Sequence, residues 1–339
     1  MTTERTLLQE RLCNIIRRFP QRKVSVVGDS VADQFVFGAI SRVSREAPVF
    51  ILRHEHTETA PGGAANCAMN LASLGASVGL ISVAGEDEAG RALTEKLQSA
   101  GVDCSGLITS PSLRTTTKVR ILAGHVHSTR QQVIRIDYEG QPLTDFRLRR
   151  SLQEKVEKEA SAADAVIISD YNYGAVNVDI VGTIRETAAT RSIPVLVDSR
   201  FQLSSYAGFT SATPNEEEVE TVLGRVLDES ELNSGGQELR ERLGYRALLV
   251  TCGGRGMILF EEGVAPLHIQ AVGARAPVDG TGAGDTVIAT YTLALASGAS
   301  FPDAARLANY AGGLVVMKRG TASITSEELE HSVLHSEVT

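Results

Sequence analysis

Short apolar runs alternate with stretches of helical periodicity along most of the chain. Apolar runs that end at glycine or aspartate predict buried strands at residues 23–29, 77–85, 165–170, 195–198 and 247–253. Apolar residues at helical spacing predict helices near residues 7–19, 62–75, 87–101, 144–162, 177–190, 284–297 and 301–316, with one more from Asn215 and one before Gly244. Strands that alternate with helices run parallel, so the pattern predicts an α/β fold with a doubly wound, mainly parallel sheet flanked by helices.

Two segments, residues 35–57 and 114–138, break this rhythm. They are rich in β-forming residues that alternate with polar ones, which predicts extended structure exposed on the surface. We expect them to form a small β lid inserted in a single domain that spans residues 1–339. A sheet this small cannot cover both of its faces, so we expect the lids of two chains to pair in a homodimer. The candidates for the buried face of the lid are Phe35, Phe37, Val49 and Ile51.

Composition narrows the class of protein. The chain is 42% hydrophobic and carries a formal net charge of -8, without a basic stretch interleaved with aromatic residues, so we expect no nucleic-acid partner. It has no apolar run of membrane-spanning length, so we expect no membrane partner. Its four cysteines lie far apart in the sequence, which is typical of reduced thiols and predicts a cytoplasmic location.

The run "VDGTGAGDTV" points to phosphate chemistry. Gly282, Ala283 and Gly284 precede an apolar helix, whose first turn offers unpaired N–H groups and the positive end of the dipole to an anion. Asp285 in that turn can deprotonate a hydroxyl while the backbone binds a phosphoryl group. A glycine-rich turn capped by aspartate is the alternative. The dinucleotide-binding fingerprint and the Walker loop are both missing, which disfavours a nicotinamide dehydrogenase.

Two segments, "GGAANCAMNLASLGASVGLISVAG" and "DGTGAGDT", resemble the two signatures of the ribokinase-like PfkB carbohydrate kinases. The second signature departs from the family at Gly280 and Thr290. Within the family, "GDSVADQFVFGAISRVSREAPV", "SDYNYGAV" and "TPNEEEVE" are most similar to the kinases that phosphorylate D-glycero-D-manno-heptose 7-phosphate at the anomeric position. Those kinases serve ADP-heptose synthesis and typically carry lysine where Tyr173 and Arg200 stand here.

The resemblance implies an ATP-dependent kinase whose acceptor is a sugar or sugar phosphate, with Asp285 as the catalytic base. It implies an anion hole at Gly282, Ala283 and Gly284. Together with the positions of several residues at strand ends, the resemblance implies that the acceptor is bound by Asp33, Gly62, Gly63, Asn66, Asp170 and Arg200. It implies ATP binding by Asn215, Glu218, Thr251, Gly253, Gly254 and Asn309. The cofactor would be Mg²⁺, bound by Glu218 through water, which suits an ion that keeps most of its water ligands.

Each of these residues also has a plainer interpretation. Asn215 and Glu218 could belong to an acid-rich first helical turn that the helix dipole favours. Asp33 could be a loop aspartate, Asn66 a helix cap and Asp170 a turn residue. Other acceptors remain open, namely ribose, a ketose, a keto-deoxy sugar acid or a nucleoside. A protein of the same fold that binds a sugar or nucleotide without catalysis is a further alternative.

Overall fold

A central sheet organises the protein, whose computed structural model describes residues 2–124, 130–140, 142–273 and 277–335. In the described residues its nine strands have the order β13-β12-β11-β10-β9-β8-β1-β4-β5. The strands are β1 (Lys23–Gly28), β4 (Ser77–Gly85), β5 (Leu107–Ser110), β8 (Ala165–Asp170), β9 (Val195–Ser199), β10 (Ser211–Ala212), β11 (Ala247–Thr251), β12 (Met257–Glu261) and β13 (Leu267–Ile269). All neighbouring pairs are parallel except β11 with β12 and β12 with β13, which are antiparallel. The predicted doubly wound, mainly parallel sheet is confirmed.

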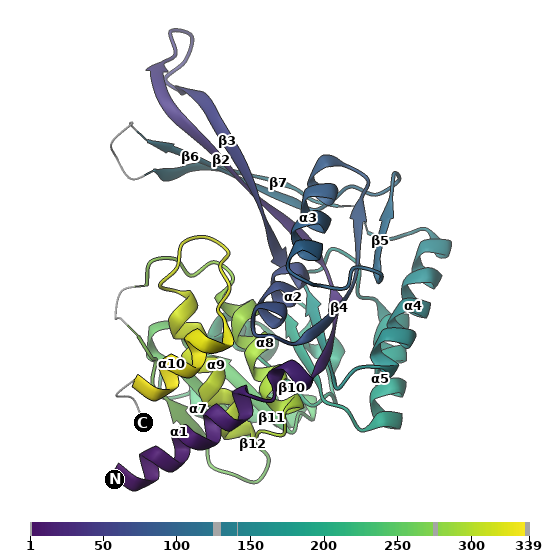
Figure 1. Cartoon of the computed structure of the whole chain (residues 1–339), viewed down its shortest axis with the longest axis vertical. Coiled ribbons are helices and arrows are strands. Elements are labelled where there is room, and N and C mark those ends of the chain that lie inside the picture. Colours follow the sequence, from purple (N-terminus) through teal and green to yellow (C-terminus); the bar gives the residue numbers. More distant parts are fainter. Residues whose placement is uncertain (1, 125–129, 141, 274–276, 336–339) are drawn as a thin grey trace.

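Helices cover both faces of this sheet (Figure 1). One face carries α1 (Thr2–Ile16), α2 (Ala64–Ser73), α3 (Glu88–Ser99), α8 (Ala283–Ala296), α9 (Phe301–Val315) and α10 (Ser326–His335). The other carries α4 (Phe146–Ser161), α5 (Val178–Arg191), α6 (Glu216–Leu223) and α7 (Leu232–Leu243). Successive strand residues point to opposite faces, so Val26 packs into the first core and Val27 into the second. In the part of the chain described here, no helix has the length and apolarity needed to cross a membrane.

A second sheet projects from the main body (Figure 1). Its order is β3-β2-β6-β7, formed by β2 (Ser30–Val43), β3 (Phe50–Gly63), β6 (Thr117–Gly124) and β7 (Gln131–Tyr138). These strands include most of segments 35–57 and 114–138, although β2 and β3 reach further toward the main sheet than expected; residues 125–129 lie outside the described residues. Asp29 alone joins β1 to β2, so the second sheet begins directly at the carboxyl edge of the main sheet.

The two faces of the second sheet differ in character. Register places Phe35 opposite Arg120, and Asp33 opposite Lys118, on the face toward the main body. The ring of Phe37 lies on the same face, stacked on His56 with 4.4 Å between ring centroids. Phe35 and Phe37, two of the candidates for the buried face of the lid, therefore lie on the face toward the main body, and their part in pairing two chains stays a prediction. The outward face instead carries Val36, Val119, Ile121, Ile134 and Ile136, which are partners in register.

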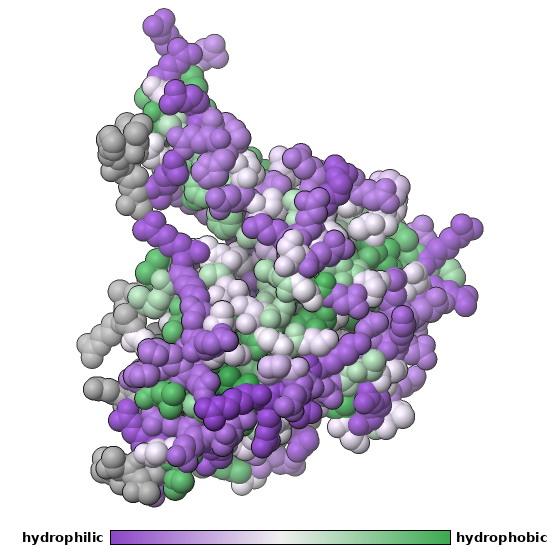
Figure 2. Space-filling view, viewed as in Figure 1, coloured by the Kyte–Doolittle hydropathy of each residue, from purple (hydrophilic) through white to green (hydrophobic). Residues whose placement is uncertain are grey.

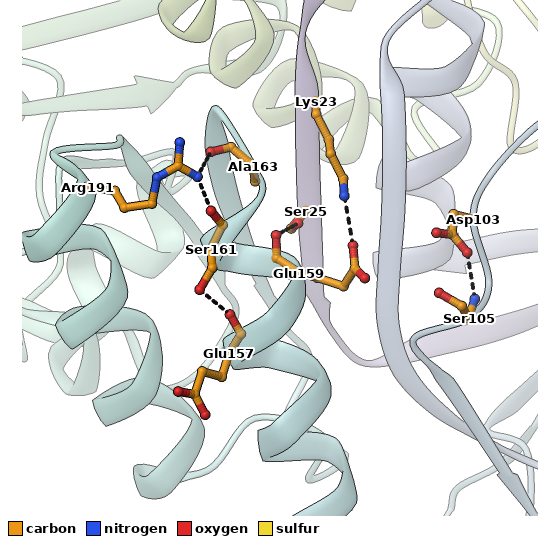
Figure 3. A network of polar contacts seen from close by, with 9 residues as sticks. All are labelled: Lys23, Ser25, Asp103, Ser105, Glu157, Glu159, Ser161, Ala163 and Arg191. Atoms are coloured by element: carbon orange, nitrogen blue, oxygen red, sulfur yellow. Dashed lines mark hydrogen bonds and ion pairs between the residues drawn. The ribbon is translucent and has the colours of Figure 1, made fainter.

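Polar contacts fasten the opposite, amino edge of the main sheet (Figure 3). Lys23 at the start of β1 forms an ion pair with Glu159 of α4 at 3.0 Å, and the Ser25 hydroxyl donates to the Glu159 carbonyl at 3.1 Å. The guanidinium of Arg191, at the end of α5, donates to the carbonyls of Ser161 and Ala163. These contacts fix the helices behind the strands, while the carboxyl edge is left for side chains and loops.

Candidate active site

Several elements meet at the carboxyl edge of the central strands. There β1 passes into β2, β3 passes into α2, and α8 begins at Ala283. In space-filling view the molecule is hollowed where the second sheet meets the main body (Figure 2). In α/β folds, ligands bind at this edge of the sheet, which makes it the place to look for a site.

The small residues at the start of α8 allow a ligand to come close to the helix backbone. Gly282 is the N-cap with φ 77°, and a Cβ there would lie 2.6 Å from the Nδ2 atom of Asn66, so only glycine fits. Within the described residues, the N–H groups of Gly284 and Asp285 have no hydrogen-bond acceptor. A Cβ on Gly284 would meet no atom nearer than Oδ2 of Asp198 at 4.0 Å. This helix start therefore offers free donors, positive dipole and open space, which suits an anion.

Asp285 is held by hydrogen bonds from two other elements. Its Oδ2 accepts from Nδ2 of Asn66 at 2.7 Å, and its Oδ1 accepts from the Tyr171 hydroxyl at 3.0 Å. Asn66 is oriented in turn by Asn70, whose own side chain accepts from Thr286. Burial raises the pKa of Asp285 to about 6, although the bonds from Asn66 and Tyr171 act to lower it. A carboxylate with such a pKa is poised to take up a proton near neutral pH.

Asp29, which sequence reasoning missed, positions Tyr171. Its Oδ2 accepts from the backbone N–H groups of Tyr171 at 2.9 Å and Tyr173 at 3.0 Å, and its Oδ1 accepts from that of Ala175 at 2.9 Å. The carbonyl of Asp29 also accepts from the N–H of Ala64 at the start of α2. One buried residue therefore ties the loop after β8 to both sheets and to α2.

One wall of the site combines residues of the second sheet and α2. Asp33 is buried on β2, where its carboxylate pairs with Arg120 of β6. A Cβ on Gly62 would lie 2.5 Å from Oδ2 of Asp33, and the charge of Asp33 contributes to the raised pKa of Asp285. Gly63 has φ 58°, and a Cβ there would lie 2.5 Å from the Asp29 carbonyl oxygen. The structure thus brings the predicted Asp33, Gly62, Gly63 and Asn66 close to Asp285.

Two predicted binding residues prove to have other partners. Asp170 accepts from the hydroxyls of Ser199 at 2.9 Å and Tyr206 at 2.7 Å, and from the backbone of Asn172 at 2.8 Å. Its carboxylate organises the loops after β8 and β9, and its contact with substrate stays a prediction. Asn309 on α9 is buried and donates to the carbonyl of Gln270 at 2.7 Å. One N–H of its side-chain amide is therefore bound within the chain, and its contact with adenine stays a prediction.

Acidic side chains gather beside the anion-binding helix start. Asn215 and Glu218 form a reciprocal capping box at the start of α6, which the plainer interpretation did not foresee. The carboxylate of Asp198, at the end of β9, accepts no hydrogen bond from the described part of the chain. Burial and the charges of Glu218 and Asp285 raise the pKa of Asp198 well above its usual value.

The predicted nucleotide residues lie along the same edge. Asn215 forms a backbone bridge with Thr251 at the end of β11. Gly253 and Gly254 follow in the 3-10 helix Gly253–Arg255, where added Cβ atoms would meet nothing within 4 Å. Open backbone of this kind can lie against a flat base.

Two basic side chains of the second sheet, Lys118 and Arg120, were also missed, whereas Arg200 was predicted. Lys118 and Arg120 point from β6 to the same face as Asp33, and Arg200 is exposed just after β9. The alternation in "TKVRI" was the available signal, because two cations two residues apart on a strand share a face. A buried carboxylate, free N–H groups and nearby cations together can hold an anion, accept a proton from a hydroxyl and promote phosphoryl transfer.

Comparison with known proteins agrees with this geometry. The family model described as pfkB family carbohydrate kinase matches residues 21–328. The chain is 44% identical over 317 residues to "Bifunctional protein HldE" of Pseudomonas aeruginosa (strain UCBPP-PA14), covering 93% of this chain and 64% of that protein. It is 42% identical over 323 residues to the protein of that name from Ectopseudomonas mendocina (strain ymp), covering 94% of this chain and 65% of that protein. The chain thus spans just under two thirds of these relatives.

Solved structures share the fold at low sequence identity. Phosphofructokinase-2 from Escherichia coli, in complex with substrates and products, aligns with a TM-score of 0.76 at 20% identity, covering 93% of this chain and 99% of that one. Arabidopsis thaliana ribokinase, complexed with ribose and ATP, aligns with a TM-score of 0.71 at 20% identity, covering 92% of this chain and 98% of that one. The ribokinase-like fold is confirmed.

Proposed function

The chain belongs to the pfkB family of carbohydrate kinases, and on that premise we propose that it transfers the γ-phosphate of ATP to a hydroxyl of a sugar phosphate. The acceptor that we favour is heptose 7-phosphate, phosphorylated at the anomeric position. The observation that carries the proposal is Asp285, a buried carboxylate with a pKa of about 6 in the first turn of α8. In the described residues the N–H groups of Gly284 and Asp285 donate no hydrogen bond, so they can bind a phosphoryl group. The heptose acceptor is supported by the similarity of "SRVSREAPV" and "TPNEEEVE" to heptose 7-phosphate kinases and by the basic side chains beside the site.

In this reaction each group has a distinct task. The acceptor hydroxyl would meet Asp285, which accepts its proton as the oxygen attacks phosphorus. The N–H groups at Gly284 and Asp285 would bind the phosphoryl oxygens as charge develops on them. The second sheet would act as a lid over the acceptor and exclude water, which otherwise competes as the nucleophile.

The donor side fits ATP with Mg²⁺. Thr251, Gly253 and Gly254 offer open backbone for the nucleotide, and a solved protein of the same fold is complexed with ribose and ATP. In the described residues the carboxylate of Asp198 accepts no hydrogen bond, and burial and the charge of Glu218 raise its pKa, which suits a divalent cation. Among the described residues no three acidic, histidine or cysteine side chains are grouped to hold a metal, so water and phosphate oxygens would complete its shell. Bound there, Mg²⁺ would neutralise phosphate charge.

The test of the proposed function is an ADP-release assay with the purified chain, ATP and Mg²⁺. Heptose 7-phosphate, unphosphorylated heptose, ribose, a ketose, a keto-deoxy sugar acid and a nucleoside serve as acceptors. We expect the highest kcat/KM with heptose 7-phosphate. ATP hydrolysis that no acceptor stimulates would favour a non-catalytic binding protein. A higher kcat/KM with a free sugar would contradict the acceptor and leave the kinase proposal standing.

The pH profile should report the environment of Asp285. This carboxylate must be ionised to accept a proton, so kcat/KM should fall as pH decreases through about 6. The hydroxyl of Tyr171 donates to Asp285 and lowers its pKa, so Tyr171→Phe should raise that pKa and move the acid limb to higher pH. Tyr206→Phe is the control, because its hydroxyl donates to Asp170 instead. An unshifted limb in Tyr171→Phe would show that the limb reports another group.

We also propose that two chains pair through the outward face of the second sheet. Ile134 and Ile136 on β7 are 52% and 38% exposed there, and exposed apolar faces of small sheets favour association. Sedimentation at micromolar concentration should show a dimer, and Ile134→Asp should give a monomer. Val226→Asp, at a valine that is 81% exposed away from this sheet, should stay dimeric. A fully active monomeric wild type would contradict the pairing.

A further inference from the structure

Two cations lie beside the site without a direct ion pair. Lys118 on β6 and Arg200 after β9 make no ion pair and donate no side-chain hydrogen bond within the described part of the chain. Burial lowers the pKa of Lys118, the charges of Asp33 and Asp137 act to raise it, and the charge of Arg200 acts to lower it. Two neighbouring cations repel each other, so such an arrangement is stable only if an anion joins them or if water screens them.

Water does not fully screen Lys118, because it is half-buried between two aromatic rings. Its Nζ lies 5.6 Å from the ring centroid of Tyr171 and 5.9 Å from that of Tyr173. Aromatic faces attract a cation, but they do not provide conventional hydrogen-bond acceptors for its three N–H groups. Burial is the main reason that the pKa of Lys118 is lowered. The ammonium is thus held in place with its donors unused.

The carboxylates that flank Lys118 already have partners. Register places Asp33 and Asp137 on either side of Lys118 across the second sheet. Asp33 pairs with Arg120, and Asp137 pairs with Arg135 at 2.9 Å. Each of these carboxylates therefore pairs directly with an arginine, and Lys118 feels their charges without forming an ion pair with either.

Tyr171 relates this cation to the catalytic base. Its hydroxyl donates to Asp285, while its ring faces Lys118. Base and cation therefore lie beside the same aromatic side chain, and the charge of Lys118 acts to lower the pKa of Asp285. An acceptor whose reacting hydroxyl meets Asp285 would place another of its groups near Lys118.

We propose that Lys118, with Arg200 beside it, binds the phosphate group that the acceptor already carries and so selects phosphorylated sugars. The proposal rests on the proposed function in one respect, that the acceptor hydroxyl meets Asp285. It adds a specificity-determining residue from the second sheet. The lid would then recognise the acceptor as well as cover it.

The test measures KM for heptose 7-phosphate, for the same heptose without phosphate and for ATP in wild type and Lys118→Gln. Charged hydrogen bonds to phosphate support an increase of about 10- to 100-fold in KM for heptose 7-phosphate. We expect KM for free heptose and for ATP to stay unchanged. Lys118→Arg should restore most of the affinity, and Lys158→Gln, at an exposed lysine of α4, is the matched control. Thermal unfolding of each variant checks that the fold is kept.

The outcomes separate this inference from the proposed function. An equal change for both acceptors, no change, or a rise only in KM for ATP would overturn the role of Lys118. If wild type does not use heptose 7-phosphate, the proposed acceptor fails, and inorganic phosphate becomes the probe. Competitive inhibition by phosphate against the true acceptor that weakens in Lys118→Gln alone would still support the anion site. Inhibition equal in all variants, or none, would overturn it.

Discussion

Turnover of the Asp285→Asn variant should fall by roughly a hundred- to ten-thousand-fold, the range typical for loss of a general base. The amide keeps the size of the carboxylate but cannot accept a proton. Asn66 and Tyr171 donate to its two oxygens, so an amide nitrogen would also face a donor. ATP affinity should be largely kept, because the N–H groups of the helix start remain. Steady-state kinetics together with calorimetric ATP binding would measure both effects.

Asp303→Asn supplies the matched control. Asp303 is also buried near the start of a helix, α9, but its carboxylate pairs with Arg11 of α1 at 2.8 Å. Its replacement should affect stability more than turnover. If Asp285→Asn retains turnover within a few-fold of wild type, the base is another group and the proposed chemistry is wrong.

Removal of the Asp29 carboxylate should have the largest effect on stability. Asp29→Ala leaves the N–H groups of Tyr171, Tyr173 and Ala175 without their acceptor. An unsatisfied buried donor costs about 1–3 kcal/mol, so we expect the free energy of unfolding to fall by about 3 kcal/mol or more. Turnover should fall as well, because Tyr171 loses its fixed position against Asp285. Urea unfolding and the pH profile would follow the two effects separately.

The control for this variant is an exposed aspartate whose carboxylate also accepts hydrogen bonds from backbone N–H groups. Asp228 accepts from the backbone N–H groups of Ser230 and Glu231, but it lies exposed in a turn. Water can replace its carboxylate there, so Asp228→Ala should destabilise much less. Equal losses in the two variants would show that burial of the Asp29 bonds adds nothing.

The main sheet was predictable because its buried strands are apolar runs with a glycine or aspartate at their ends. The pattern failed where few positions are buried. On α10 only Leu329 and Val333 are buried, and on β5 only Ile108 is. The edge strand β13 gave too little signal because it has three residues, whereas β12 was missed although four of its five residues are buried. Pro20 lies in a 3-10 turn, and α1 ends earlier at Ile16.

The helix start around Asp285 was predictable because its parts are adjacent in the sequence. Asp29 was not, because its partner Tyr171 lies 142 positions away and only the fold joins them. Lys118 depends on strand register in the same way, since its surroundings come from β2, β7 and the loop after β8. Asp170 shows the same limit. Its position at a strand end was predictable, but its contacts with Ser199 and Tyr206 could be known only from their packing.

The connectivity of the second sheet bears on the order in which the protein folds. β2 and β3 form a hairpin from adjacent residues, whereas β2 meets β6 in parallel, with Ala32 through Ala39 against Thr117 through Gly124. All of α2, β4, α3 and β5 lies between these strands, and such distant pairing is slow because a long loop must close first. Until then the edge of β2 is open to other chains. The residues that recognise the acceptor would thus be assembled only after this loop closes, when β6 brings Lys118 and Arg120 to Asp33.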